Sequence, residues 1–102
     1  MSGGAMLDKL TKETFEPLIG GAFELSLGEG QTLPLELSAV LGTGLQGMAK
    51  REQFSLHFRG PASPALVQRT YRLEHAQLGS LEIFLVPIRR DATGMMYEAV
   101  FT

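Results

Sequence analysis

The chain has 102 residues, the length of one domain, with 44% hydrophobic residues and a net charge of −2. This charge disfavours binding to nucleic acid, because such binding depends on neutralising phosphates with basic side chains. Cysteine is absent, which excludes disulfides and thiolate chemistry, and the densest apolar run, LEIFLVPI, is too short to cross a bilayer.

The first residues are small and lack periodicity, so we expect a flexible tail over residues 1–9 and a single domain over residues 10–102. The opening stretch MSGGAMLDKL has neither the apolar core nor the cleavage pattern of a signal peptide. We therefore expect a cytoplasmic protein that does not associate with membranes.

The stretch LTKETFEPLIGG predicts one short helix. Thr11 is a suitable N-cap, and Leu10 can pack against Phe15 across the first turn. Pro17 limits the helix because the residue before a proline disfavours helical geometry. The side chains expected to plug one end of the core are Phe15, Leu18 and Ile19.

After Gly21 the apolar residues recur at every second position, which predicts β-strands with one buried face. The residues expected to face inward are Phe23, Leu25 and Leu27; Leu33, Leu35, Leu37, Ala39 and Leu41; Phe54, Leu56 and Phe58; Tyr71, Leu73 and His75; and Tyr97, Ala99 and Phe101. The stretch SLEIFLVPI differs, because both of its faces become apolar after Glu82. It predicts a strand that is covered on both sides.

These segments make six short strands, nearly all separated by tight turns. Short connections favour antiparallel pairing, since parallel neighbours need a long crossover. The predicted fold is mainly β: a small antiparallel six-stranded barrel or rolled sandwich with one short N-terminal helix.

The stretch GTGLQG, residues 42–47, has the glycine spacing of a dinucleotide-binding loop. That loop must lead into a helix, whereas only MAKREQ separates it from the next alternating strand. The acid that would bind the ribose is also missing, because the apolar PALVQ occupies the corresponding position. We therefore predict that Gly42, Gly44 and Gly47 bind no nucleotide.

The remaining polar residues do not form a recognisable catalytic or metal site. His57, His75 and Glu74 could supply three metal ligands, but Glu74 and His75 point to opposite faces of their strand. No Gly-x-Ser-x-Gly stretch marks a serine nucleophile. We expect no catalytic residues, no metal ligands and no cofactor; an enzyme would require His57 and His75 to converge on a cleft. Arg59 is expected to pair with an acid such as Glu82, and His75 to bond to the adjacent turn.

Four stretches, TFEPLIG, FSLHFRGP, YRLEHAQLGSLEIFLVPI and YEAVFT, resemble a family of small uncharacterised bacterial single-domain proteins. The similarity covers most of the chain from Leu10 onward, apart from GTGLQGMAK. The resemblance implies an association of some members with genes for phage-tail-like collar proteins. It carries over no catalytic residues.

The predicted function is a non-enzymatic interaction domain, an accessory or assembly component of a phage-tail-like system. The alternative is a small-ligand-binding β-barrel, which needs an internal cavity with polar groups, whereas the inward residues here are apolar. We expect a protein partner and no nucleic acid, in the cytoplasm or in a phage-tail-like particle. A homo-oligomer stays an open alternative.

The segment from Gly42 to Glu52 is the first candidate for the partner contact, because it is long for a hairpin connection. It places two apolar side chains beside two basic ones, which is the composition of a docking patch. These residues are Leu45, Met48, Lys50 and Arg51. Two alternatives remain: the apolar side chains fold back over an open end of the barrel, or the contact lies on the strand faces around His57 and Arg59.

Overall fold

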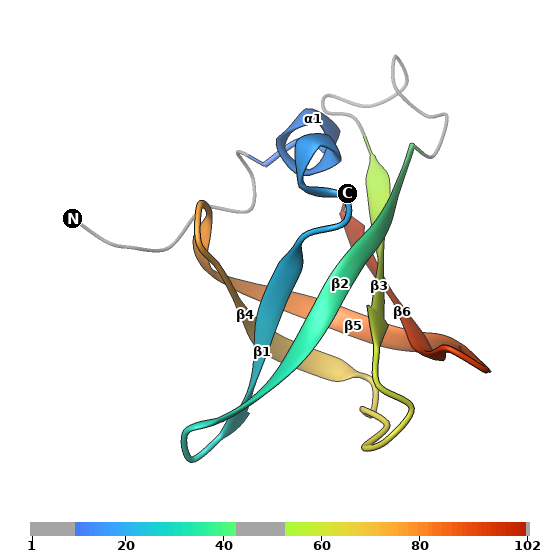
Figure 1. The fold of residues 1–102 in the computed structure, drawn as a ribbon. Coiled ribbons are helices and arrows are strands. Elements are labelled where there is room, and N and C mark those ends of the chain that lie inside the picture. The colour runs from blue at the N-terminus through green and yellow to red at the C-terminus, as the bar shows by residue number, and fades with distance from the viewer. Residues whose placement is uncertain (1–9, 43–52, 102) are drawn as a thin grey trace.

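The six strands of the computed structural model form one closed antiparallel barrel in the order β1-β2-β3-β6-β5-β4 (Figure 1). The strands are β1 (Ala22–Gly28), β2 (Gln31–Gly42), β3 (Phe54–Gly60), β4 (Arg69–His75), β5 (Gly79–Asp91) and β6 (Gly94–Phe101). The structure describes residues 10–42 and 53–101, so the predicted tail lies outside it. The predicted fold class is confirmed, as a barrel rather than a sandwich.

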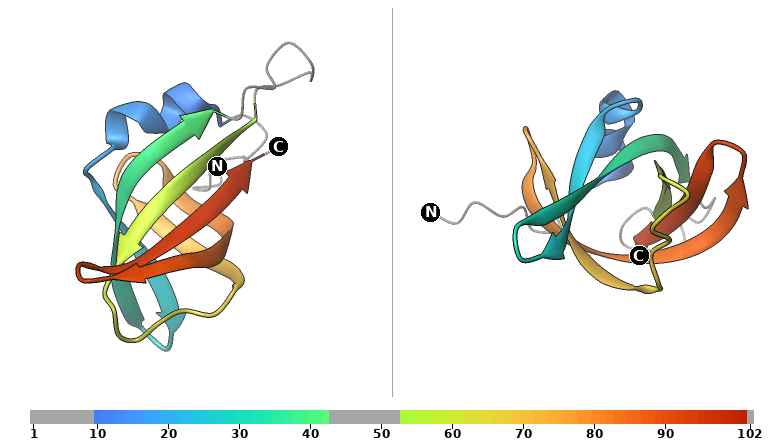
Figure 2. Two further views of the ribbon diagram at one scale, coloured as in Figure 1. Left: turned by 90° about the vertical axis from the view of Figure 1, so that its right-hand side faces the viewer. Right: turned by 60° about the horizontal axis from the view of Figure 1, so that its bottom comes forward.

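A single helical turn precedes the barrel and covers one of its ends (Figure 2). Helix α1 (Lys12–Phe15) follows Thr11, whose amide donates a hydrogen bond to the Thr14 hydroxyl at 3.1 Å. Pro17 then continues the chain as a 3-10 turn, η2 (Glu16–Leu18). No helix in the described parts of the chain has the length and apolar character needed to cross a bilayer.

The helix plugs the barrel end mainly through Phe15, which is fully buried. Its ring lies 5.9 Å from the ring of Phe54 and 5.6 Å from that of Phe101, measured between centroids. Leu18 packs at the edge of the core, but the expected burial of Ile19 is wrong, since 48% of its surface is exposed. Ile19 follows the 3-10 turn, where the chain already leaves the barrel end to enter β1.

The predicted alternation holds along most of the barrel, and two bulges account for the errors. A register shift in β2 between Leu37 and Ala39 moves Val40 against the core. Leu41 is therefore 44% exposed instead of buried, and Ala39 is only half-buried. A second shift at the end of β1 leaves Leu27 40% exposed. One inserted residue exchanges the two faces of a strand, which alternation alone does not reveal.

The prediction that β5 is covered on both faces is also wrong. Leu81, Ile83 and Leu85 face the interior and are buried, whereas Phe84 is 50% and Ile88 43% exposed on the outside. Within the described residues nothing packs as a second layer over this strand. The apolar outer positions of β5 are therefore available at the molecular surface.

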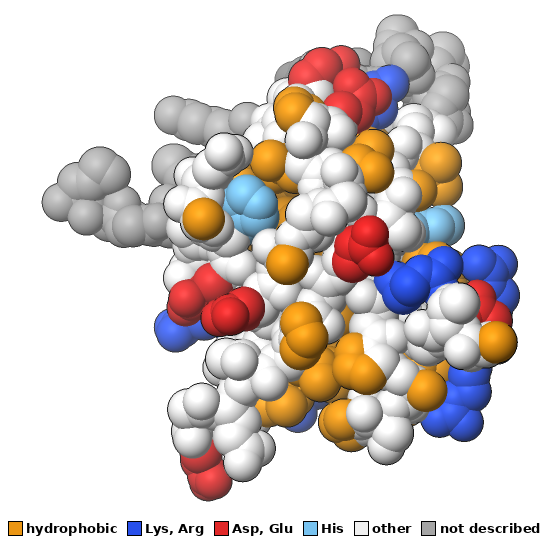
Figure 3. All heavy atoms as spheres, viewed as in Figure 1, with side chains coloured by type: hydrophobic (Ala, Val, Ile, Leu, Met, Phe, Trp, Pro, Cys, Tyr) orange, Lys and Arg blue, Asp and Glu red, His pale blue; other side chains and the backbone are white. Residues whose placement is uncertain are grey.

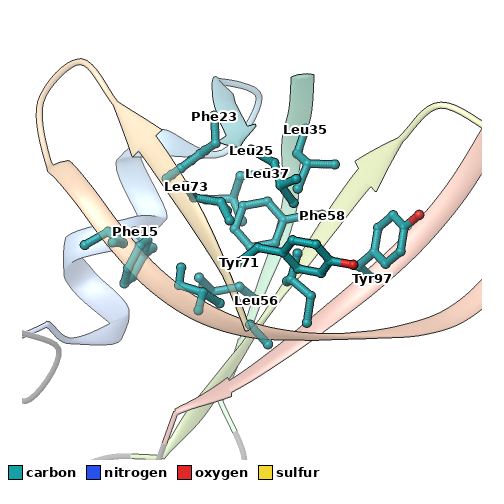
Figure 4. Packing of buried hydrophobic residues seen from close by; sticks show 14 of the residues in the cluster. Phe15, Phe23, Leu25, Leu35, Leu37, Leu56, Phe58, Tyr71, Leu73 and Tyr97 are labelled. Carbon is teal, nitrogen blue, oxygen red and sulfur yellow. The ribbon is translucent and has the colours of Figure 1, made fainter. Parts of the chain in front are cut away.

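The interior is filled by apolar side chains that point toward one another from opposite strands (Figure 4). Phe23 meets Phe58 edge-to-face with ring centroids 5.3 Å apart. Tyr97 is the largest fully buried side chain, and its hydroxyl accepts a hydrogen bond from the Leu66 amide at 2.8 Å. Every buried side-chain nitrogen and oxygen of the described residues has a hydrogen-bond partner.

Truncation of Phe101 is expected to destabilise the barrel strongly. Its ring stacks on Phe54 at 4.8 Å and lies in the plug around Phe15. Phe101→Ala should lower the free energy of unfolding by about 3–5 kcal/mol, the usual range for a buried aromatic ring. The adjacent Val100 is 59% exposed, so Val100→Ala is a matched control that should cost about 0.5 kcal/mol or less. Urea unfolding measures both, and equal midpoints would contradict the expectation.

Candidate functional site

The structure separates the six predicted partner-binding residues into two groups. His57 and Arg59 lie on β3, with their side chains on the outer face of the barrel and half-buried. The other four, Leu45, Met48, Lys50 and Arg51, lie outside the described residues. The geometry of the candidate site is therefore that of the outer face of β3 and its neighbours.

His57 lies at the centre of a row of side chains that crosses four strands. The pairing of β3 with β6 places it opposite Glu98, and its Nε2 lies 3.3 Å from Glu98 Oε2. Ala39 of β2 flanks His57 on one side, and Val86 of β5 flanks Glu98 on the other. This polar pair therefore lies between two small or branched apolar side chains.

The next row along the barrel is more apolar. Leu41 lies opposite Ser55, which lies opposite Val100, and Ser55 is buried between them at 6% exposure. The β5–β6 pairing ends at Val86↔Glu98, and Phe84 and Val100 are the next outward residues of the two strands. Leu41, Phe84 and Val100 are 44%, 50% and 59% exposed. We refer to the six residues Leu41, His57, Phe84, Val86, Glu98 and Val100 as the outer-face patch.

Sequence reasoning identified only His57 among these six residues. Phe84 and Val86 lie in the apolar stretch that predicts a doubly covered strand, whereas Val100 is at an outward position of the last strand. Glu98 was visible only as an outward acid. Its position beside His57 depends on the β3–β6 register, which the sequence pattern does not specify.

Arg59 forms the expected ion pair with an acid, at one end of the patch, but the acid is Asp91 and not Glu82. Its Nη1 lies 3.3 Å from Asp91 Oδ1 and donates to the Thr93 hydroxyl. Glu82 lies near the other end of β5, opposite Arg72 of β4. Because β5 runs on into the hairpin with β6, its last residue reaches Arg59 across β6.

The β5–β6 hairpin is held firmly against β3. Gly94 has a φ of 135°, and a Cβ at this position would overlap the carbonyl oxygen of Gly60. This close backbone contact holds Asp91 and Thr93 beside Arg59. Asp91 Oδ1 accepts two hydrogen bonds from Thr93, from the amide at 2.9 Å and from the hydroxyl at 2.7 Å.

Charged side chains are distributed unevenly over the barrel. Basic side chains gather near the β5–β6 hairpin, whereas most acidic ones lie elsewhere on this face, some of them over α1 (Figure 3). Arg89 belongs to the basic group, and its Nε lies 3.7 Å from Asp91 Oδ2. The outer-face patch therefore has a basic rim at the hairpin end.

The two histidines do not converge. His57 is on β3 and His75 at the end of β4, and in the closed barrel at least two strands separate these in either direction. His75 Nδ1 accepts a hydrogen bond from the Gln77 amide at 3.0 Å, which confirms the predicted bond to the turn. Within residues 10–42 and 53–101 no three potential ligand side chains gather into a metal-binding group.

Comparison with known proteins places the chain in a family. It belongs to the family described as a domain of unknown function (DUF6916), whose model matches residues 10–101. A search of curated proteins and a search of solved structures each gave no match. The matched range covers the whole barrel and its helical plug.

The carboxyl of Asp91 should titrate below its ordinary value of 3.8. The Thr93 hydroxyl, then the Thr93 amide and the charge of Arg59, lower the pKa of Asp91. A lowered pKa in the folded state means that ionised Asp91 stabilises the fold above pH 3.8, and that this contribution disappears as the pH falls through the folded value. Carbon-detected NMR titration should show the Asp91 midpoint rising in Thr93→Ala. An unchanged midpoint would contradict this assignment.

Proposed function

We propose that this domain is a non-enzymatic protein-interaction module that binds a protein partner through the outer-face patch. The observation that carries the proposal is the grouping of Leu41, Phe84 and Val100, all 44% or more exposed, on one face of the barrel. Scattered apolar residues are ordinary on a protein surface, but a contiguous group is typical of an interaction site.

The composition of the patch and its surroundings is that of a protein interface. Its apolar side chains surround the His57–Glu98 pair, so a partner that covers them would also remove a polar pair from water. Arg59 and Arg89 lie at the hairpin end, where a rim residue would meet solvent and a partner's acidic groups. Apolar centres with charged rims are the common arrangement of protein interfaces.

The packing of the interior favours this proposal over the small-ligand-binding barrel. A ligand inside the barrel would have to replace side chains such as Phe23, Leu25 and Phe58, all of which are fully buried. Three cavities lined by described residues open to the surface and not to the centre of the barrel. Binding through the exterior requires no such rearrangement.

The role of the interaction is proposed from the resemblance. The stretches that resemble small bacterial single-domain proteins support an accessory or assembly component of a phage-tail-like system, in the cytoplasm or in the particle. Assembly components need surfaces for neighbours rather than a reaction centre. The patch, with half-buried His57 beside Glu98, agrees with that role.

Site-specific photo-crosslinking in the producing cells tests this proposal. A benzophenone amino acid at position 100 should give a discrete adduct with one partner protein, because Val100 is the most exposed residue of the patch. The same group at position 19 is the matched control, since Ile19 is similarly exposed outside the patch. The adduct should disappear when Val86→Glu places a charge within the patch.

Two results would contradict the proposal. Equal adducts from positions 19 and 100 would indicate non-specific contact, and no adduct from position 100 would remove the patch as the interface. An adduct with twice the mass of the chain would identify the partner as a second copy. Thermal unfolding of Val86→Glu confirms that the variant is folded.

A further inference from the structure

The barrel closes through one very short seam. β1 and β4 pair only at Glu24↔Glu74 and Leu25↔Leu73, whereas the other neighbouring strands pair over five to seven residue pairs. Beyond Leu25 the two strands diverge. The backbones of residues 26–28 and 69–72 therefore have a ladder partner on one side only, and the opposite edges face each other across a gap.

A surface cleft of about 380 Å³ lies where the two strands diverge. Its walls include Leu27 and Gly28 from the end of β1, and Arg69, Tyr71 and Arg72 from β4. The segment at Val67 forms its rim. We refer to this site as the seam cleft.

Two tyrosine hydroxyls fix the rim of the seam cleft. The Leu66 amide donates to the Tyr97 hydroxyl at 2.8 Å, and the Tyr71 hydroxyl donates to the Val67 carbonyl at 2.8 Å. Tyr71 and Tyr97 belong to the packed interior (Figure 4), so the rim is tied to the core at two consecutive residues. A cleft with a fixed rim loses little conformational entropy when a ligand binds.

The side chains of the seam cleft combine apolar surface with positive charge. Leu27 and Val67 are 40% and 64% exposed. The guanidinium of Arg69 lies 5.4 Å from the centre of the Tyr71 ring, and Arg72 is exposed on the same strand. No carboxylate lines the cleft, and neither arginine forms an ion pair with another described residue.

We propose that the seam cleft binds an extended acidic peptide segment of a partner protein, which adds as a strand to the free edge of β4. Unpaired backbone amides and carbonyls of residues 69–72 would pair with the peptide backbone, as in other cases of strand addition. Arg69 and Arg72 would bind its carboxylates, while Leu27 and Val67 would contact its apolar side chains. Because the two arginines are positively charged, the complementary occupant is an acidic peptide.

The cleft fits a peptide better than a nucleic acid. Single-stranded nucleic acids bind to exposed aromatic faces, but Tyr71, the one aromatic residue lining the cleft, is 8% exposed and lies under Arg69. An edge of unpaired backbone groups, in contrast, is specific to a peptide. In the closed strand order this seam lies opposite the β3–β6 pair, so the site extends the proposed interaction function to a second surface.

Binding of synthetic peptides to the full chain tests the inference. The probe is an end-blocked peptide of about eight residues in which two glutamates alternate with two valines. Both faces of the added strand then carry carboxylates, because Arg69 and Arg72 lie on opposite faces of β4. In NMR titrations it should produce saturable amide shifts at residues 26–28 and 65–72. The same peptide with lysine in place of glutamate should produce none at equal concentration.

N-methylation of the probe separates strand addition from simple charge attraction. Methyl groups on every second amide remove donors from one edge of the peptide, and the two possible sets remove opposite edges. One set should abolish binding, and the other should leave it intact. Equal binding by both sets would overturn strand addition.

Arginine variants test the assigned contacts. Arg69→Gln and Arg72→Gln should each weaken the glutamate peptide about tenfold. The matched control is Arg90→Gln, which removes the same charge from an exposed arginine outside the cleft and should leave affinity unchanged. Tyr71→Phe, which frees the rim from one hydroxyl, should also weaken binding. Amide spectra establish that each variant is folded.

Four outcomes would overturn the inference. The first is no saturable shift up to about 1 mM peptide, and the second is equal shifts with the lysine peptide. The third is stronger shifts of the same amides with a short oligothymidylate. The fourth is the same shifts when the protein concentration alone is raised. The third would assign the cleft to nucleic acid and the fourth to a second copy of the chain. Because no variant alters the outer-face patch, failure here leaves the crosslinking result independent.

Discussion

Closure of the barrel through the β1–β4 seam is the constraint on which the other features depend. Leu25 and Leu73 face each other across the seam, and both are fully buried, so the two paired positions also complete the core. Closure directs one face of every strand inward and the other outward. Among the described residues, no second layer packs over these outer faces, whatever their polarity. The same seam is too short to pair the ends of β1 and β4, which is why a cleft opens beside it.

Both proposed sites are fixed by contacts with the barrel rather than carried on free loops. At the outer-face patch, the close contact of Gly94 with Gly60 holds the hairpin that positions Asp91 and Thr93 beside Arg59. At the seam cleft, Tyr71 and Tyr97 hold the rim. Sites supported in this way lose little entropy on binding, so a modest apolar area can give useful affinity. The two sites face different directions, and a small domain could thereby bridge two neighbours.

Much of the fold could be predicted from the sequence, because alternation of apolar residues and tight turns determines strand number and inward faces. The errors arise where that pattern is ambiguous. A bulge in β2 exposes Leu41 and turns Val40 inward, and the pattern contains no signal for the inserted residue. The apolar outer face of β5 has the same pattern whether it is covered or exposed. The partners of Arg59 and His57 depend on which strands become neighbours, and this is a property of topology rather than of local sequence.

The positions of the exposed apolar residues support the proposed function more strongly than their number does. Seven large apolar side chains of the described residues are 40% or more exposed, namely Ile19, Leu27, Leu41, Val67, Phe84, Ile88 and Val100. Three belong to the outer-face patch and two to the seam cleft. The interior is already filled without them, and a threonine would suit the outer face of a strand equally well. Stability of the barrel therefore does not account for these residues, whereas the proposed partner contacts would account for the five that lie at the two surfaces.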